Sequence, residues 1–512
     1  MSKINKIKTL SIFCTTFLFQ LIFAQAPIIQ WKKSFGGTEF DDAFCIEKTL
    51  DGGYIVAGQS NSNNGDVTGN HGYGDYWIVK LNNNGSIQWQ KSYGGSNYDF
   101  INSIQQTSDG GFITAGNSYS KNGDVDGNKG SDDAWIVKLG STGNIQWKKS
   151  IGGSGSDSAN SIQQTSDGGY IIAGFSNSND GDVSGNHGKG DFWIIKLSTT
   201  GIIEWQKMLG GSDDDFVSSI KTTSDGGYIA VGQSISNNGN VTGNHGDFDI
   251  WAVKLAGNGN IEWQKSIGGS EYEDAYSVQQ TTDGGFIIAG YSNSNDGDVS
   301  GNHGDFDACI VKLTSNGVIQ WQKSIGGNAY EEIGSVICTS DGDYVIAGFS
   351  NSNNGDLTQN YGSYDGWIVK LGDNGNLLWQ KSFGGSKYDN ISSILETADG
   401  GYVFAGGSYS NDGDATGNHG NYDYWVVKLD SDKLSTVENY NNKILVENPV
   451  RDKFNIQTTE TIISLQLYTT DGKLIKISDN KNMSVASLLK GIYLLKIQFK
   501  NGKIYTEKII KD

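Results

Sequence analysis

The stretch YIVAGQSNSNNGDVTGNHGYGDYWIVKLNNNGSIQW, residues 54–89, decides the fold because close variants of it recur every 58 residues. A unit this short cannot bury both of its faces alone, so neighbouring copies must pack on one another. The chain therefore contains one long array of repeats. The interval is marked seven times, without insertion or deletion, by Trp31, Trp89, Trp147, Trp205, Trp263, Trp321 and Trp379.

The sequence pattern of each unit predicts four short strands. In the second unit, alternating apolar positions and β-branched or aromatic residues predict strands at 101–107, 112–118, 134–139 and 145–150. Tight turns join the first strand to the second and the third to the fourth, and a long polar loop joins the second strand to the third. Both faces of the strands carry apolar residues, so units on either side must cover them. We expect an all-β propeller with four-stranded blades.

The first and last units are out of phase by one strand. A segment of the fourth-strand type lies at 28–34, and the last unit ends with its third strand at 424–429. The first strand can therefore complete the seventh blade, which removes an open sheet edge. This phase predicts a closed ring of seven blades.

Three patterns carry a family resemblance: Asp-Gly-Gly-Tyr-Ile at 51–55, Trp-Ile-Val-Lys-Leu at 77–81 and Gly-x-Ile-x-Trp at 85–89. The repeats that contain them resemble the blades of quinoprotein-like β-propellers, and the resemblance implies that fold. It implies no quinone, because the residues of that family's cofactor pocket have no match here.

Composition and charge exclude several classes of partner. The formal net charge is −19, so the surface repels phosphate backbones and nucleic acid is not an expected partner. Arg451 is the only arginine, which leaves little capacity for two-pronged binding of phosphate or carboxylate groups. Cys45, Cys309 and Cys338 fall at three different repeat positions, so we expect buried thiols and no disulfide framework.

Both ends of the chain depart from the repeat. Residues 1–25 are typical of a secretory signal peptide, with lysines followed by a short apolar run and a small-residue exit. No later segment is apolar for long enough to span a membrane. We assign residues 26–431 to the propeller, 432–442 to a linker and 443–512 to a small immunoglobulin-like β-sandwich.

A third set of motif residues lies in the C-terminal segment: Asn448, Pro449, Gly472, Lys473, Gly491, Tyr493, Lys508 and Lys511. With these residues the segment resembles the C-terminal sorting domain of the type IX secretion system of Bacteroidetes. Glu447 stands where the family usually has a proline. The resemblance implies that the outer-membrane translocon of this system is a partner, and that the protein is secreted or held on the outer-membrane surface.

Recurring acids crowd the rim on which the long loops are expected. An aspartate such as Asp75 precedes the third strand of every unit, and an acid such as Asp99 follows the fourth. Sevenfold identity favours a structural role, in turns and in ion pairs with lysine between blades. Calcium is the alternative and the one candidate cofactor, because some loops begin like EF-hand or dockerin loops, although the later ligand positions do not match. The candidate ligands are Asp66, Asn70, Asp182, Asn186, Asp298 and Asn302.

Catalytic motifs are not apparent. No serine or cysteine has a histidine partner in a recognisable motif, whereas carboxylate pairs for glycoside cleavage stay open as an alternative. We therefore expect a non-catalytic protein that binds a glycan or a surface protein on its loop-rich rim; the alternatives are a polysaccharide hydrolase and a calcium-stabilised spacer. The histidines lie one to a blade, too far apart for a shared zinc site: His71, His187, His245, His303 and His419.

Overall fold

A computed structural model describes residues 26–357, 359–432, 445–446, 450–457, 461–469, 473–478, 482–500 and 504–511. Within these ranges the chain forms strands and loops, and no helix long and apolar enough to cross a membrane is found. The chain divides into two compact units between Ser431 and Asp432. The predicted signal peptide and residues 433–442 of the predicted linker lie outside the described residues.

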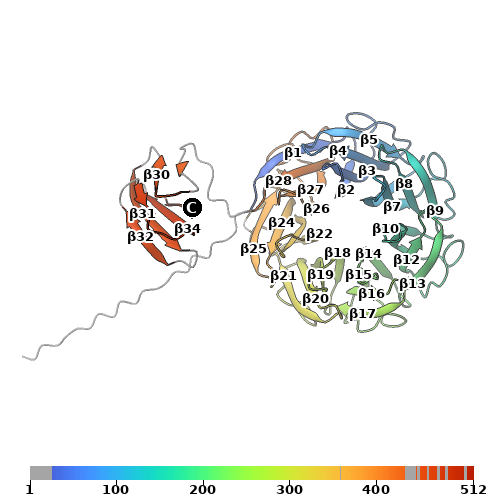
Figure 1. The fold of residues 1–512 in the computed structure, drawn as a ribbon. Helices are drawn as coiled ribbons and strands as arrows, with labels where there is room; N and C mark the ends of the chain where they lie inside the picture. Colours follow the sequence, from blue (N-terminus) through green and yellow to red (C-terminus); the bar gives the residue numbers. More distant parts are fainter. Residues whose placement is uncertain are drawn as a thin grey trace, which may run out of the picture. The chain divides into compact units, whose positions relative to one another are not determined.

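The first unit consists of seven four-stranded antiparallel sheets, the blades, arranged around a central axis (Figure 1). In each blade the first strand is innermost, and the order runs outward to the fourth. From blade 1 to blade 7 the strands are β2 (Asp41–Lys48), β3 (Tyr54–Ser60), β4 (Asp75–Leu81), β5 (Ile87–Tyr93); β6 (Asp99–Gln106), β7 (Phe112–Ser118), β8 (Asp133–Leu139), β9 (Ile145–Ile151); β10 (Asp157–Gln164), β11 (Tyr170–Ser176), β12 (Asp191–Leu197), β13 (Ile203–Leu209); β14 (Asp215–Thr222), β15 (Tyr228–Ser234), β16 (Asp249–Leu255), β17 (Ile261–Ile267); β18 (Glu273–Gln280), β19 (Phe286–Ser292), β20 (Asp307–Leu313), β21 (Ile319–Ile325); β22 (Glu331–Cys338), β23 (Tyr344–Ser350), β24 (Asp365–Leu371), β25 (Leu377–Phe383); β26 (Ser393–Glu396), β27 (Tyr402–Ser408), β28 (Asp423–Leu429) and β1 (Ile29–Phe35).

The ring closes as the phase of the repeats predicts. β1 pairs antiparallel with β28, so that Ser34 lies opposite Trp425 and the first strand of the chain completes blade 7. The seam is also bonded to blade 1, because the hydroxyl of Tyr424 donates to the carbonyl oxygen of Trp77 at 2.8 Å. The outer edge of β28 is therefore covered by β1.

Neighbouring blades bury their apolar faces against each other. Between blades 3 and 4, Phe192 and Ile194 of β12 share a fully buried cluster with Trp251 and Val253 of β16. The rings of Phe192 and Trp251 lie 4.6 Å apart at a steep angle, a favourable edge-to-face arrangement. This packing confirms the prediction that adjacent units cover both faces of each sheet.

The innermost strands carry a β-bulge. In β2 the pairing with β3 shifts between Ala43 and Cys45, which leaves Phe44 without a paired residue. Gly58 stands opposite the bulge, and a Cβ there would lie 1.9 Å from the carbonyl oxygen of Asp42. The bulge therefore requires glycine at this position of strand two, and all seven repeats have it.

The C-terminal unit is a small two-sheet sandwich. One hydrophobic cluster joins its two sheets and includes Ile456, Met483, Leu467 and Ile497. The sheets have the orders β29–β30–β33 and β32–β31–β34–β35. Their strands are β29 (Leu445–Val446), β30 (Lys453–Gln457), β31 (Ile462–Thr469), β32 (Leu474–Ser478), β33 (Asn482–Ser484), β34 (Gly491–Phe499) and β35 (Ile504–Lys511).

Candidate functional site

One rim of the propeller carries the long loops. The loop that enters each innermost strand and the loop between the second and third strands are bonded together there. In blade 1, Gly36 N donates to Asp66 Oδ2 at 3.3 Å and Thr38 N donates to Asn64 Oδ1 at 2.9 Å. The predicted loop-rich rim is therefore present, and the candidate sites lie on it.

The acids that begin the innermost strands are structural. Asp41 is fully buried, and it accepts hydrogen bonds from the hydroxyls of Ser60 and Ser62 and, at 2.7 Å, from Gly37 N. Equivalent contacts recur around the ring, with Glu273 and Glu331 in the aspartate's place in two blades. These carboxylates fix both rim loops, which explains why they repeat.

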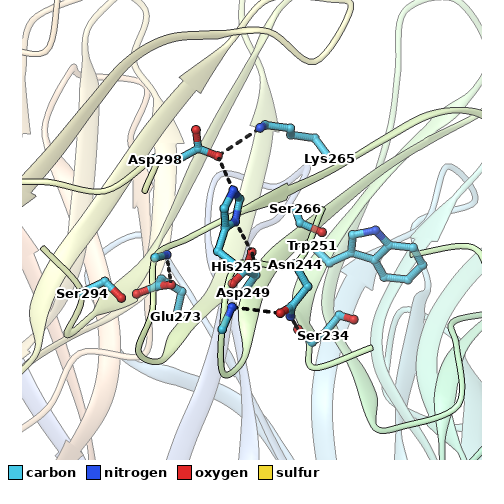
Figure 2. Close-up of polar contacts among 12 residues, drawn as sticks. Ser234, Asn244, His245, Asp249, Trp251, Lys265, Ser266, Glu273, Ser294 and Asp298 are labelled. Carbon is cyan, nitrogen blue, oxygen red and sulfur yellow. Dashed lines mark hydrogen bonds and ion pairs between the residues drawn. The ribbon is translucent and has the colours of Figure 1, made fainter. Parts of the chain in front are cut away.

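A second recurring network includes the histidines. Figure 2 shows His245 between Asp249 and Asp298. Its Nδ1 lies 2.6 Å from Asp249 Oδ2, and its Nε2 lies 3.9 Å from Asp298 Oδ2 of the next blade, which also binds Lys265 Nζ at 3.0 Å. Burial raises the pKa of Asp249 to about 6, although the hydrogen bond from His245 acts to lower it. The network braces a loop against its neighbouring blade.

The recurring lysines of the third strands form ion pairs inside a blade. Lys80 Nζ lies 2.9 Å from Asp51 Oδ2, and both residues belong to blade 1. The expectation that such pairs join neighbouring blades is therefore wrong for this position, because the lysine runs along its own sheet to the turn between the first two strands. Lys254 has two carboxylate partners, Asp225 at 2.9 Å and Glu262 at 3.0 Å.

The six calcium candidates have partners within the protein. Asn70 Oδ1 accepts from Gly72 N at 2.9 Å, and its Nδ2 donates to the carbonyl oxygen of Ser60; Asn186 and Asn302 make the corresponding contacts. Asp66 bonds to a backbone N–H, whereas Asp182 and Asp298 pair with lysines. Over the described residues, no group of three or more His, Cys, Asp or Glu side chains could hold a metal ion. Calcium binding stays a prediction.

An axial cavity of about 550 Å³ opens among the innermost strands. Its lining includes the bulge residue of every blade, a position where the repeats differ although their frameworks match. Glu332, Phe349 and Tyr388 also line it. The seven bulge-position residues are Phe44, Asn102, Asn160, Ser218, Tyr276, Gly334 and Ser392.

The cavity has two chemically different sides. On the side of blades 2 and 3, Asn102 and Asn160 donate their amide N–H groups to carbonyl oxygens of the next blade. On the side of blades 5 to 7 the wall is aromatic. Ring centroids follow one another at 5.8, 6.1, 6.1 and 5.6 Å along Tyr276, Tyr291, Tyr330, Phe349 and Tyr388.

Two acids lie on this side of the cavity: Glu332 lines it, and Asp274 lies near Glu332. Glu332 accepts a hydrogen bond from the Tyr330 hydroxyl at 2.7 Å, and burial raises its pKa. Asp274 is 4% exposed, and its Oδ1 has no hydrogen-bond partner in the described part of the chain. Burial raises the pKa of Asp274 to about 8, with Glu332 adding a smaller effect in the same direction. Such groups stabilise a positive charge or deliver a proton.

A separate set of rings is exposed on the rim at blades 1 and 2, and we call it the tyrosine ladder: Tyr73, Tyr98, Phe100 and Tyr119. Their successive centroids lie 5.4, 5.7 and 6.3 Å apart. Tyr73 is 65% exposed and Tyr98 is 39% exposed. Recurrence along the chain indicates neither the ladder nor the cavity, because both sites consist of residues that differ between repeats.

The sorting motif is only partly described. Tyr493 is buried, and its hydroxyl donates to the carbonyl oxygen of Leu489 at 2.8 Å, which holds the chain where β34 begins. The other described motif residues lie in β34, β35 or the turn before β32: Lys473, Gly491, Lys508 and Lys511. The remaining three lie outside the described residues: Asn448, Pro449 and Gly472.

Residues 448–512 match the family described as "Secretion system C-terminal sorting domain". This match confirms the predicted sorting domain. The domain marks substrates of the type IX secretion system, so the protein is secreted or attached to the cell surface. No curated protein matches the chain.

Several solved structures resemble the chain. The extracellular domain of a putative one component system from B. thetaiotaomicron is 12% identical, with a TM-score of 0.40; the match covers 93% of this chain and 57% of that one. The β-propeller domain of the trilobed protease from Pyrococcus furiosus is 10% identical, with a TM-score of 0.38; that match covers 76% of this chain and 94% of that one. An α-L-arabinofuranosidase from Fusarium graminearum is 13% identical, with a TM-score of 0.36; that match covers 64% of this chain and 93% of that one. The chain thus spans little more than half of the first of these proteins.

Proposed function

We propose that the protein is a non-catalytic binding protein, exported by the type IX secretion system, that holds a glycan on the tyrosine ladder. The exposed ladder carries this proposal. Soluble proteins rarely leave contiguous aromatic rings in water without a binding role, and Tyr73 is the most exposed of these four rings.

The chemistry of the ladder suits a carbohydrate. Tyrosine combines a large apolar ring with a hydroxyl, so it can pack on the C–H face of a sugar and hydrogen-bond to its edge. The surrounding loops are rich in Asn and Ser, which both donate and accept hydrogen bonds, and in Asp, whose carboxylate accepts them. The overall negative charge favours neutral or basic polymers over acidic ones.

Calorimetric titration of the secreted protein with a panel of neutral soluble polysaccharides tests the proposal. We expect one or more polymers to bind, and the double substitution Tyr73→Ala with Tyr98→Ala to weaken that binding at least tenfold. Tyr361→Ala is the matched control, because Tyr361 lies on the same rim, is 45% exposed and is outside the ladder. Binding of proteins but of no polysaccharide would refute the choice of ligand, as would an equal loss in the control.

Three predictions from the sequence remain beside this one. A polysaccharide hydrolase would find its proton donor in Asp274 or Glu332, whose pKa values are raised by burial, and reducing-sugar release lost in Glu332→Gln would identify it. A calcium-stabilised spacer would lose melting temperature in chelator. The quinoprotein-like type of the blades also stays a prediction.

A further inference from the structure

We propose that the axial cavity is a second binding site, distinct from the tyrosine ladder, and that it binds the ammonium group of an organic cation between Glu332 and the rings of Tyr276, Phe349 and Tyr388. The four residues come from blades 5, 6 and 7 and line the same cavity. The proposal does not depend on glycan binding by the ladder.

The repeats differ from one another at this cavity. At the bulge position, blade 5 has Tyr276, whereas blades 6 and 7 have Gly334 and Ser392. A bulge residue pairs with no residue of the neighbouring strand, so strand pairing does not require Tyr276. Glycine at 334 does have a structural reason, because a Cβ there would lie 2.9 Å from the carbonyl oxygen of Ser392. The asymmetry therefore points to a ligand that occupies one side of the axis.

The aromatic wall suits a cation. The face of an aromatic ring carries negative charge density, and it attracts an ammonium group more strongly where water is displaced. Tyr276, Phe349 and Tyr388 line the cavity, and Tyr291 and Tyr330 connect them in one series of ring contacts. Among the described residues that line the cavity, none carries a positive charge, so the place of a cation is not taken by a lysine, arginine or histidine.

The acids supply the countercharge. Glu332 lines the cavity and accepts a hydrogen bond from the Tyr330 hydroxyl. Behind it, Asp274 is almost completely buried with Oδ1 unpaired. Burial of a carboxylate without a cationic partner is costly, and an ammonium group beside Glu332 would lower that cost.

Ionisation of these acids couples binding to pH. The described titratable groups around Glu332 are Asp274 and Tyr276 of β18, Tyr291 of β19, Tyr330 next to β22 and Tyr388 of blade 7. Burial raises the pKa of each of these groups. The pKa of Asp274, about 8 in the free protein, means that a bound cation displaces a proton near neutral pH. Affinity should therefore rise from pH 6 to pH 8.

The test compares choline with dimethylbutanol, its neutral carbon isostere, by titration calorimetry on the full secreted chain. We expect choline to bind at least tenfold more tightly than the isostere, and this preference to disappear in Glu332→Gln. Glu39→Gln, at an exposed glutamate of the same rim, should leave the preference unchanged. A lysine-containing tripeptide as a third probe distinguishes a free small cation from a protein side chain, and preferential binding of either supports ammonium recognition.

A second measurement does not depend on a variant that folds. Choline binding to the unmodified chain at pH 7 in two buffers of different ionisation enthalpy should show net proton release. The proposal is overturned if neither choline nor the peptide binds better than the isostere, if Glu332→Gln retains the preference, or if binding releases no proton. Loss of polysaccharide binding by the tyrosine ladder variants leaves these results unaffected, so the two proposals can fail separately.

Discussion

Two glycines that both need positive φ should respond differently to alanine. Gly201 has φ +76°, and a Cβ there would lie 3.0 Å from Trp147 Cζ3 of the neighbouring blade. Gly226 has φ +84°, and nothing lies within 4 Å of its would-be Cβ. The pair therefore separates backbone strain, which both positions share, from crowding of the tryptophan that marks each repeat.

The expected magnitudes follow from these two effects. Gly226→Ala should lower the free energy of unfolding by about 1 kcal/mol, the cost of a left-handed conformation with a side chain. Gly201→Ala should lower it by about 2–4 kcal/mol, since crowding of a packed ring adds roughly 1–3 kcal/mol. Trp147 cannot tilt freely, because its ring packs edge-on against Tyr170 at 5.9 Å.

Equilibrium guanidinium denaturation, followed by tryptophan fluorescence and by circular dichroism, measures both losses. The decisive variant adds Gly201→Ala to Trp147→Ala: without the large ring, alanine at 201 should cost only the amount seen at Gly226. Equal costs for the two single substitutions, or an unchanged cost at 201 in the Trp147→Ala background, would show that contact with the tryptophan does not explain the glycine.

Three further outcomes are expected. Asp51→Asn should lower the free energy of unfolding by about 1–3 kcal/mol, because it leaves the buried Lys80 without a carboxylate partner. Asp225→Asn should lower it by less, because Glu262 remains beside Lys254. Denaturation of both variants measures the difference. Burial raises the pKa of the Asp274 carboxyl from 3.8 to about 8 in the folded chain. Its contribution to stability is therefore full below pH 4 and is lost as the pH rises towards 8, by at most about 1.4 kcal/mol per pH unit. Asp274→Asn should flatten this part of the curve of unfolding free energy against pH. Tyr424→Phe should cost about 1 kcal/mol by removing one hydrogen bond across the seam, and a loss within the error of the melting curve would contradict that role.

The architecture could be predicted from the sequence because the repeat constrains it at every level. The phase difference between 28–34 and 424–429 was sufficient to predict closure, and β1 does pair with β28. The strand bounds differ slightly from the prediction. The strand expected at 101–107 spans Asp99–Gln106, because Asp99 pairs with Ser118 and extends the strand at its start. Cys45 and Cys338 are half-buried where full burial was expected, while all three described cysteines are free.

The candidate sites could not be found by the same method. Recurrence identifies residues such as Asp41, whose hydrogen bonds every blade needs. The environment of Asp274 in blade 5 includes Glu332 of blade 6, which in turn accepts a hydrogen bond from Tyr330. No spacing within one repeat contains that information.

The bulge explains how one position can hold five different residue types in the seven blades. Its residue pairs with nothing on the second strand, so its side chain does not affect the ladder of hydrogen bonds, while Gly58 and its equivalents must remain glycine to let the backbone approach. The cost of changing the side chain is therefore low at a bulge residue that makes no contact with the next blade, unlike Asn102, Asn160 and Gly334, and high at the residue opposite. A ring of such positions around one axis separates the framework from the binding surface, and substitutions such as Ser218→Tyr should alter what the cavity binds with little change in stability.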